Sequence, residues 1–224
     1  MRVVCIYTAQ HPVSCDRAAR CLESAEPFGI AVDLHPSVYW TDIKQTATDL
    51  GLAWRLQPHT IRRTTTTHCP AFRIANGLTH YQLYQECAAG TDPICILEHD
   101  AVFVAPLPDT IPAGITAVSS HKPGQIDEDW YQSGIDAGRY KAVGPVPDFT
   151  QHGIIPHPYS KTSGTSGYII TPDAADALVR HIQVNGVANA DCLYRDIFGG
   201  KLWLAIPQPA EMHKVRIDYC EDRE

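Results

Sequence analysis

The first forty residues alternate a strand pattern, a helix pattern and a second strand pattern. Residues 2–8 (RVVCIYT) form a β-branched apolar run that ends in polar residues, which is typical of a buried strand. Apolar positions at helical spacing follow over residues 14–29, with Ser14 as a suitable N-cap and a proline and a glycine at the end. Residues 30–40 (IAVDLHPSVYW) give the second strand. A doubly wound α/β sheet begins in this way, although the glycine fingerprint of ordinary dinucleotide-binding folds is missing.

The chain continues to alternate helix and strand patterns. The apolar spacing of residues 74–90 predicts a helix, and residues 91–104 predict a turn and a buried strand with an acidic end. Residues 115–121 give a further strand. Residues 164–182 predict a strand and then a helix that begins with a proline, with Thr171 as its N-cap. The pattern therefore favours an α/β fold over an all-α or all-β one.

Length and composition fit one such domain over residues 1–224, built as a mixed, Rossmann-like sheet flanked by helices. No apolar run reaches the roughly 18 to 20 residues of a membrane span, and the N-terminus is a poor signal peptide, so we expect a cytoplasmic protein. The eight cysteines contain no C-x-x-C pair. Because Cys5 and Cys95 fall in expected core strands, we interpret the cysteines as reduced structural thiols.

The charge of the chain is unevenly distributed. A net charge of −7 argues against broad nucleic-acid binding, yet no acidic residue lies between Asp49 and Glu86. This segment holds four arginines, among them Arg62 and Arg63. It suggests a local anionic ligand such as a diphosphate or a nucleic-acid backbone. The alternative is a solvated loop that happens to contain arginines.

Residues 94–104 (ICILEHDAVFV) place two carboxylates and a histidine at the end of a strand that is otherwise typical of a core. Ligands of open α/β sheets collect at the carboxyl ends of strands. On an extended chain the side chains of Glu98 and Asp100 point the same way, so both can address one ligand. Two converging carboxylates favour a cation between them, and Mg²⁺ or Mn²⁺ bound to a substrate diphosphate is the simplest choice. The alternative is an ordinary acidic turn.

Four segments, in the same order along the chain, resemble glycosyltransferase family 25, which includes lipopolysaccharide and collagen galactosyltransferases. ILEHDAVF at residues 96–103 resembles the family's ILEDDA strand. ANGLTHYQLYQ at residues 75–85 is similar to its GC-x-x-SH helix start. GTSGYIITPDAADAL at residues 164–178 resembles GT-x-x-Y-x-I-S-x-x-A-A-x-x-L, and NADCLYRD at residues 189–196 resembles P-x-D-x-x-L.

The resemblance implies a GT-A fold and a hexosyl- or pentosyltransferase that moves a sugar from a nucleotide sugar, which we expect to be a UDP-sugar. Residues 1–104 would form the nucleotide-sugar-binding half and residues 105–224 the acceptor-binding half. Glu98 and Asp100 would be the metal-binding motif, usually D-x-D, with His99 in the middle place and with Glu98 touching either the metal or the ribose of the donor. His213, in the expected tail at residues 210–219, would complete the metal site.

Further roles follow from the same resemblance. Tyr7 and Thr8 end the first strand, where the base and ribose lie in this fold. Thr165 and Ser166 would contact the donor sugar, or alternatively sit in a tight glycine turn. Arg62 and Arg63, or Lys214 and Arg216, would bind the diphosphate. Asp191 would be the catalytic base, or instead an N-cap; Glu128 and Asp129 are reserve candidates. His80 is expected to be structural.

The acceptor stays open between two classes. A saccharide is the default, and the aromatic residues between positions 122 and 163 suit sugar stacking. The alternative is a 5-hydroxymethylated pyrimidine base in phage-type DNA, which requires base extrusion and arginines on the phosphates. Two other functions use the same residues differently: a non-catalytic nucleotide-binding module, and a metal-dependent phosphohydrolase or nucleotidyltransferase.

Overall fold

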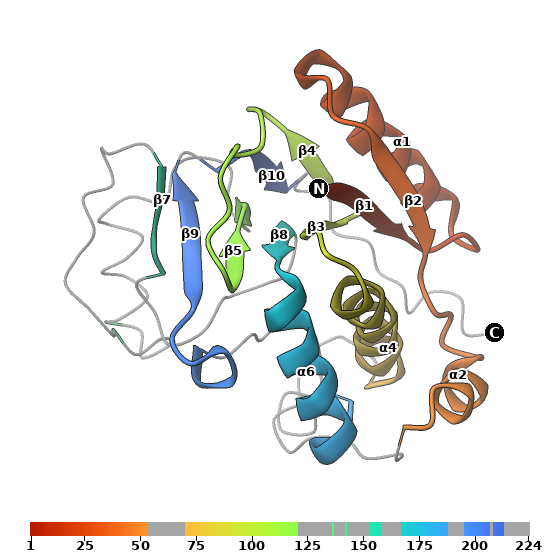
Figure 1. The fold of residues 1–224 in the computed structure, drawn as a ribbon. Helices are drawn as coiled ribbons and strands as arrows, with labels where there is room; N and C mark the ends of the chain where they lie inside the picture. The colour runs from red at the N-terminus through yellow and green to blue at the C-terminus, as the bar shows by residue number, and fades with distance from the viewer. Residues whose placement is uncertain are drawn as a thin grey trace.

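A seven-stranded mixed β-sheet is the central element of the structure, a computed structural model (Figure 1). The structure describes residues 1–52, 70–120, 136, 142, 153–157, 167–187, 195–206 and 208–212. The strands of the large sheet are β1 (Arg2–Tyr7), β2 (Val32–Pro36), β3 (Ile94–Glu98), β5 (Ile115–Ala117), β7 (Gly153–Pro156), β8 (Gly167–Ile170) and β9 (Leu202–Ile206). Their spatial order is β2-β1-β3-β8-β5-β9-β7.

The directions of these strands decide which ends share an edge. Strands β1, β2 and β3 are parallel, whereas β8 runs antiparallel to both β3 and β5. Strand β9 is parallel to β5, and β7 is antiparallel to β9. The carboxyl ends of β1, β2, β3 and β5 therefore meet the amino end of β8 at one edge of the sheet.

A second, three-stranded sheet lies beside the first. Its strands are β4 (Ala101–Phe103), β6 (Ser119–Ser120) and β10 (Ala210–Met212), in the order β4-β10-β6. Strand β10 is antiparallel to β4 and parallel to β6. The chain passes from the large sheet into the small one between β3 and β4, across only two residues, His99 and Asp100.

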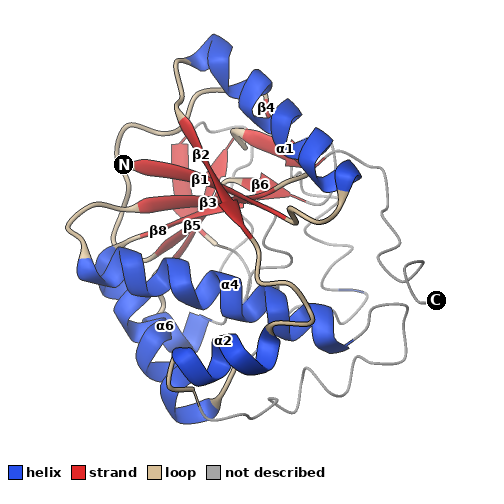
Figure 2. Ribbon diagram, turned by 90° about the vertical axis from the view of Figure 1, so that its right-hand side faces the viewer, coloured by secondary structure: helices blue, strands red, loops and turns tan. Residues whose placement is uncertain are grey.

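Helices cover both faces of the large sheet (Figure 2). In the described residues these are α1 (Pro12–Ala25), α2 (Ile43–Asp49), α4 (Pro70–Ala89) and α6 (Pro172–Asn185), with the 3-10 helices η1 (Glu26–Phe28) and η2 (Arg195–Phe198). Helix α1 packs on one face, where its core includes Cys5, Cys21 and Cys95. Helices α2, α4 and α6 pack on the other face around Leu78 and Tyr168. These two layers confirm the expected α/β, Rossmann-like fold.

Helices α1 and α6 both begin with a proline and have no side-chain hydrogen bond at the N-cap. Thr171 is the N-cap residue of α6, as expected, but its hydroxyl accepts a hydrogen bond from the backbone N–H of Gly114 at 2.9 Å instead of capping the helix. The prediction that Ser14 caps the first helix is wrong. Helix α1 begins at Pro12, because proline needs no N–H donor and has a helical φ at this position. Ser14 lies inside the helix and accepts from the N–H of Thr8 at 2.8 Å.

Three strand predictions differ from the structure. The run at residues 94–104 is broken into β3 and β4, and the run at residues 115–121 is broken at Val118 into β5 and β6. The expected tail at residues 210–219 begins with strand β10, whose three residues are too few to show a period in the sequence. The breaks occur where the chain leaves one sheet for the other.

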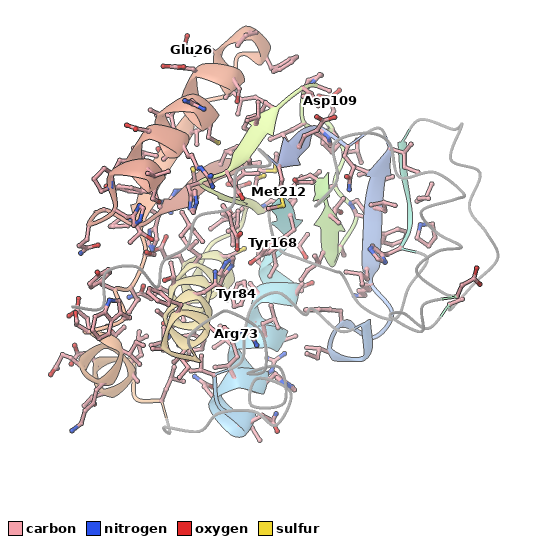
Figure 3. All side chains as sticks on the ribbon, turned by 180° about the vertical axis from the view of Figure 1, so that it is seen from behind. Glu26, Arg73, Tyr84, Asp109, Tyr168 and Met212 are labelled. Carbon is pink, nitrogen blue, oxygen red and sulfur yellow. The ribbon has the colours of Figure 1, made fainter. Side chains whose placement is uncertain are left out.

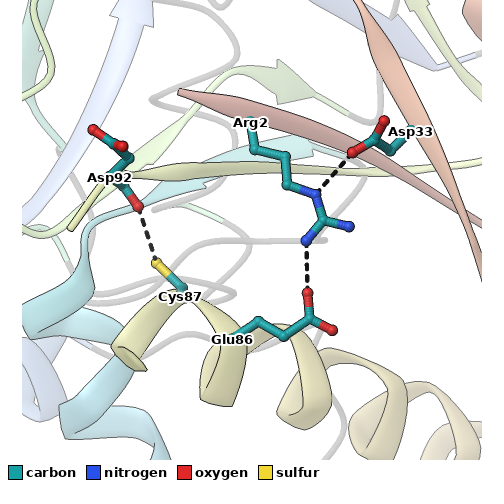
Figure 4. Close-up of polar contacts among 5 residues, drawn as sticks. All are labelled: Arg2, Asp33, Glu86, Cys87 and Asp92. Carbon is teal, nitrogen blue, oxygen red and sulfur yellow. Dashed lines mark hydrogen bonds and ion pairs between the residues drawn. The ribbon is translucent and has the colours of Figure 1, made fainter. Parts of the chain in front are cut away.

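Arg2 joins three elements at the amino end of the parallel strands (Figure 4). Its guanidinium donates to Asp33 in β2 at 2.8 Å and to Glu86 in α4 at 2.6 Å. Nearby, the Cys87 thiol contacts the backbone oxygen of Asp92 at 3.9 Å. The Arg2 ion pairs are largely exposed, which limits each to less than about 1 kcal/mol. This edge is therefore held by structural contacts, and the opposite edge carries the candidate site.

None of the helices in the described ranges is both long and apolar enough to cross a membrane.

Candidate functional site

The acidic turn, Glu98-His99-Asp100, lies at the carboxyl edge of the parallel strands. Glu98 is the last residue of β3 and is paired with Ile6 of β1. Tyr7 and Thr8 therefore leave β1 beside the turn. His99 and Asp100 lead directly into β4 of the second sheet. The structure thus brings Tyr7, Thr8, Glu98 and Asp100 to one edge, at the junction of the two sheets.

The expectation that the chain stays extended from Glu98 to Asp100 is wrong. The chain turns at His99 and Asp100, so the alternation of an extended chain does not decide where the two carboxylates point. Both nevertheless lie near the same thiol of β1. The pKa of Cys5 is raised far above its usual value, first by the neighbouring Cys21 thiol, then by burial, with smaller contributions from Asp100 and Glu98.

Thr8 is held in place by contacts on two sides. Its hydroxyl lies 3.1 Å from that of Ser37, in the residues after β2, and its N–H donates to Ser14. Ser37 also donates its backbone N–H to the oxygen of Tyr7 at 2.7 Å. The ends of β1 and β2 are therefore tied together beside the acidic turn.

His99 is a neutral residue in this environment. Burial, together with the nearby Arg17 and His11, lowers the pKa of its imidazole to about 4. Arg17 is buried in α1, with 7% of its surface exposed. His99, in the middle of the turn, therefore adds no charge near pH 7, while the buried guanidinium of Arg17 lies close by.

Beneath the turn, three polar side chains lie on one face of α4 at four-residue spacing. The amide Nδ2 of Asn76 donates to Glu98 Oε1 at 3.3 Å. His80 Nδ1 lies 2.6 Å from the hydroxyl of Tyr168 in β8, and Tyr84 completes the chain with its hydroxyl 2.9 Å from the same Tyr168 oxygen. Tyr84 and Tyr168 lie together near the middle of the molecule (Figure 3). We call Asn76, His80, Tyr84 and Tyr168 the polar seam.

Burial controls the ionisation of the polar seam. It lowers the pKa of His80, which has no exposed surface, to about 3, so the ring is neutral near pH 7. Burial likewise raises the pKa of Tyr84 and of Tyr168 well above the usual range. The seam is therefore a neutral hydrogen-bonded network, and its histidine is structural as expected.

Ten of the predicted site residues, with their alternatives, lie outside the described residues: Arg62, Arg63, Glu128, Asp129, Thr165, Ser166, Asp191, His213, Lys214 and Arg216. For two of them the neighbouring residue is informative. Gly167, which follows Ser166, is paired with Leu97, one residue before Glu98. Met212, which precedes His213, is paired with Ala101, one residue after Asp100.

The donor atoms of the acidic turn suit a hard divalent cation. Glu98 and Asp100 offer carboxylate oxygens, and Mg²⁺ is commonly bound by one or two carboxylates together with waters and substrate phosphates. Within the described part of the chain, no group of three or more histidine, cysteine, aspartate or glutamate side chains is arranged to hold a metal. The described residues therefore fit such a cation as a partial site, which a substrate diphosphate or a further ligand would complete.

Sequence reasoning missed Arg17, Asn76 and Tyr168. A signal existed for Arg17, because it falls on the apolar face of a helix that also buries Ala18 and Cys21. Asn76 stands one turn before His80 in the predicted helix, which would have placed the two side chains on one face. Tyr168 lies in an apolar strand, and its partner His80 is 88 residues away, so no local pattern indicates the contact.

The fold and this edge define an α/β protein with an acidic turn at the carboxyl edge of its sheet. A comparison with protein families gives its class: the family model for glycosyltransferase family 25 (LPS biosynthesis protein) matches residues 73–194. That range covers more than half of the chain and includes α4, the acidic turn, β8 and α6. The chain belongs to glycosyltransferase family 25 and is a glycosyltransferase. No curated protein matches it.

Proposed function

We propose that the chain transfers a sugar from a UDP-sugar to an acceptor hydroxyl, with the donor diphosphate bound at the acidic turn together with Mn²⁺ or Mg²⁺. One observation carries this proposal. Glu98 and Asp100 lie at the carboxyl edge of three parallel strands and at the junction of two sheets, where open α/β sheets bind ligands. The family supports sugar transfer, and the two carboxylates support a cation as the diphosphate partner.

In this proposal Glu98, Asp100 and His213 hold the cation, which when bound stabilises the departing diphosphate as a Lewis acid. The covalent link between Met212 and His213 supports this assignment, because consecutive Cα atoms are about 3.8 Å apart and Met212 is paired with the residue after Asp100. Arg62 and Arg63, or Lys214 and Arg216, would add charge-assisted hydrogen bonds to the phosphate oxygens.

Tyr7 and Thr8 would bind the base and the ribose of the donor. The support is their position beside the turn and the contact between the hydroxyls of Thr8 and Ser37, which keeps a donor–acceptor pair at that edge. Thr165 and Ser166 would contact the sugar. Ser166 directly precedes Gly167 in the chain, and Gly167 is paired with Leu97, the residue before Glu98. This position supports that role.

Asp191 would accept the proton of the acceptor hydroxyl as a general base, and Glu128 or Asp129 would do so in its place. The alternative role of Asp191 as an N-cap stays open, because Asp191 lies outside the described residues. The role of Asp191 stays a prediction that a carboxylate-to-amide substitution can test.

A panel of nucleotide sugars and acceptors tests the proposed function. Each donor is incubated with Mn²⁺ or Mg²⁺, alone, with simple saccharides, or with hydroxymethylated DNA, and free nucleoside diphosphate is measured. We expect release from a UDP-sugar that a saccharide stimulates. Stimulation by DNA instead, with a rate that falls steeply as salt rises, would replace the saccharide with the DNA acceptor.

Other results of the same panel would contradict glycosyl transfer. Release of inorganic phosphate or pyrophosphate would indicate a phosphohydrolase or a nucleotidyltransferase. Binding of nucleotide sugar without any product, across all donors and acceptors, would favour the non-catalytic nucleotide-binding module.

A further inference from the structure

The contact between Asn76 and Glu98 links the acidic turn to the polar seam. Glu98 ends β3, and its Oε1 accepts from an amide on α4, 22 residues earlier in the chain. One helical turn further along α4, His80 is bonded to Tyr168 in β8, the strand next to β3. Tyr84 adds a second bond to the same hydroxyl. The face of α4 that carries Asn76 is therefore fastened to the sheet directly beneath the turn.

Two polar atoms of this arrangement lower the stability of the folded chain. Asn76 Oδ1 and His80 Nε2 are buried and have no hydrogen-bond partner among the residues that the structure describes. A buried polar atom without a partner costs about 1–3 kcal/mol, and native proteins contain few of them. An apolar side chain of similar volume at position 76 would avoid that cost. Stability alone therefore does not explain an asparagine at this place.

Orientation of the Glu98 carboxylate explains the asparagine better. A hydrogen bond from an amide N–H to a charged oxygen is stronger than one between neutral groups, and it fixes the side chain that accepts it. Groups that fix metal-binding carboxylates in this way typically change metal affinity 10–100-fold when they are removed. Asn76 lies on a 20-residue helix that packs on the sheet, which gives the donor a rigid base.

We propose that Asn76 is a positioning residue of this glycosyltransferase, which orients the Glu98 carboxylate toward the donor diphosphate and its cation while His80, Tyr168 and Tyr84 hold α4 in register with the sheet. The inference rests on the proposed function, because it assigns the carboxylate that Asn76 orients to the diphosphate site.

The experiment compares Asn76→Leu with Asn76→Gln. Leucine has the same number and branching of side-chain heavy atoms as asparagine and removes both its donor and its unpartnered oxygen, whereas glutamine keeps an amide donor. Asn185→Leu is the matched control, since Asn185 is exposed on α6 and its amide donates to His181. Two quantities are measured: the Mn²⁺ affinity in the presence of UDP, from the free-Mn²⁺ electron paramagnetic resonance signal, and the thermal midpoint without metal.

We expect Asn76→Leu to bind Mn²⁺ about 10-fold or more weakly, with a thermal midpoint equal to or above that of the wild type. Asn76→Gln should recover part of the affinity, and Asn185→Leu should match the wild type. A merely structural residue would instead lower the midpoint and leave the Mn²⁺ affinity of the folded protein unchanged.

Glu98→Gln separates failure of the inference from failure of the proposed function. If Glu98→Gln weakens Mn²⁺ binding while Asn76→Leu and Asn76→Gln bind like the wild type, the positioning role is overturned and the metal site stands. If the wild type itself binds no Mn²⁺ with UDP, the metal-dependent site is overturned together with the inference.

Discussion

At the scale of single residues, the hydroxyl of Tyr168 fastens β8 to helix α4 beneath the acidic turn. It bonds to two side chains of α4 from a strand adjacent to β3, and its ring is stacked on His80 with 5.8 Å between the centroids. A buried network of this kind fixes a single packing arrangement when its members are paired. The neutrality of His80 is part of that arrangement, because a charged imidazole would be fully buried against the tyrosines of the seam, which carry no opposite charge.

The ionisation of His80 predicts a pH dependence of stability. Its pKa is about 3 in the folded chain and 6.5 in an ordinary environment. The unfolded state therefore takes up a proton between these values and the folded state does not. Stability from neutral His80 is complete above pH 6.5 and is lost progressively as the pH falls toward about 3, by at most about 1.4 kcal/mol per pH unit.

We expect the free energy of unfolding, measured by urea denaturation from pH 7 to pH 4.5, to fall less steeply in His80→Gln than in the wild type. Glutamine keeps a hydrogen-bonding group near Tyr168 and does not titrate. His181→Gln, at a half-buried position on α6, should change the slope much less. Equal slopes for the wild type and His80→Gln would contradict the neutral, buried histidine.

At the scale of secondary-structure elements, the close approach of β8 to β3 shapes the edge of the site. A Cβ atom on Gly167 would lie 2.8 Å from Leu97 Cδ2 and 2.9 Å from Ser119 Cβ. These distances are too short for real contacts, so only glycine allows β8 to begin directly beside the acidic end of β3. The glycines of the sequence SGTSGY therefore serve packing at least at this position.

Gly167→Ala should lower the free energy of unfolding by about 1–3 kcal/mol, because the added methyl group would displace Leu97 or Ser119. Gly90→Ala is the matched control. A Cβ there meets only the carbonyl oxygens of Cys87 and Glu86 at 3.6 Å, an ordinary contact distance. Urea midpoints compare the two variants, and equal midpoints would show that β8 can move away from β3 without loss.

The elements with strong local signals were predictable from the sequence. The β-branched run of β1, the apolar spacing of α1 and the proline of α6 depend on neighbouring residues alone. The two-residue step from β3 to β4 was not predictable, because apolar residues continue on both sides of it. Strand β10 was missed because three residues show no period, and its pairing with β4 links positions about 110 residues apart.

The candidate site also contains features that were predictable from the sequence and features that were not. Glu98 and Asp100 were predictable because carboxylates at the end of an apolar strand are conspicuous in any sequence. The contact of Asn76 with Glu98 and the contact of Tyr168 with His80 were not predictable, because each joins segments that only the folded chain brings together.

At the scale of the whole molecule, the mixed sheet places the edge used by the parallel strands against a second, smaller sheet. The acidic turn is the covalent link between the two, and β10 returns to the same place from the end of the described chain. The family match shows a glycosyltransferase, and the fold places its acidic turn at this edge. In the proposed function, the acidic turn and the net charge of −7 would both repel the anionic donor. A cation bound with the donor would offset that repulsion.

The most direct test of this account is the rate of metal-dependent nucleoside diphosphate release by Asp100→Asn, compared with the wild type and with Asp109→Asn. Asp109 is an exposed carboxylate after β4, far from Tyr168 (Figure 3). We predict that Asp100→Asn lowers the rate by about 100-fold or more, since Lewis-acid stabilisation of the leaving diphosphate contributes several kcal/mol. Asp109→Asn should keep the wild-type rate. A wild-type rate in Asp100→Asn would contradict the acidic turn as the site of diphosphate and metal binding.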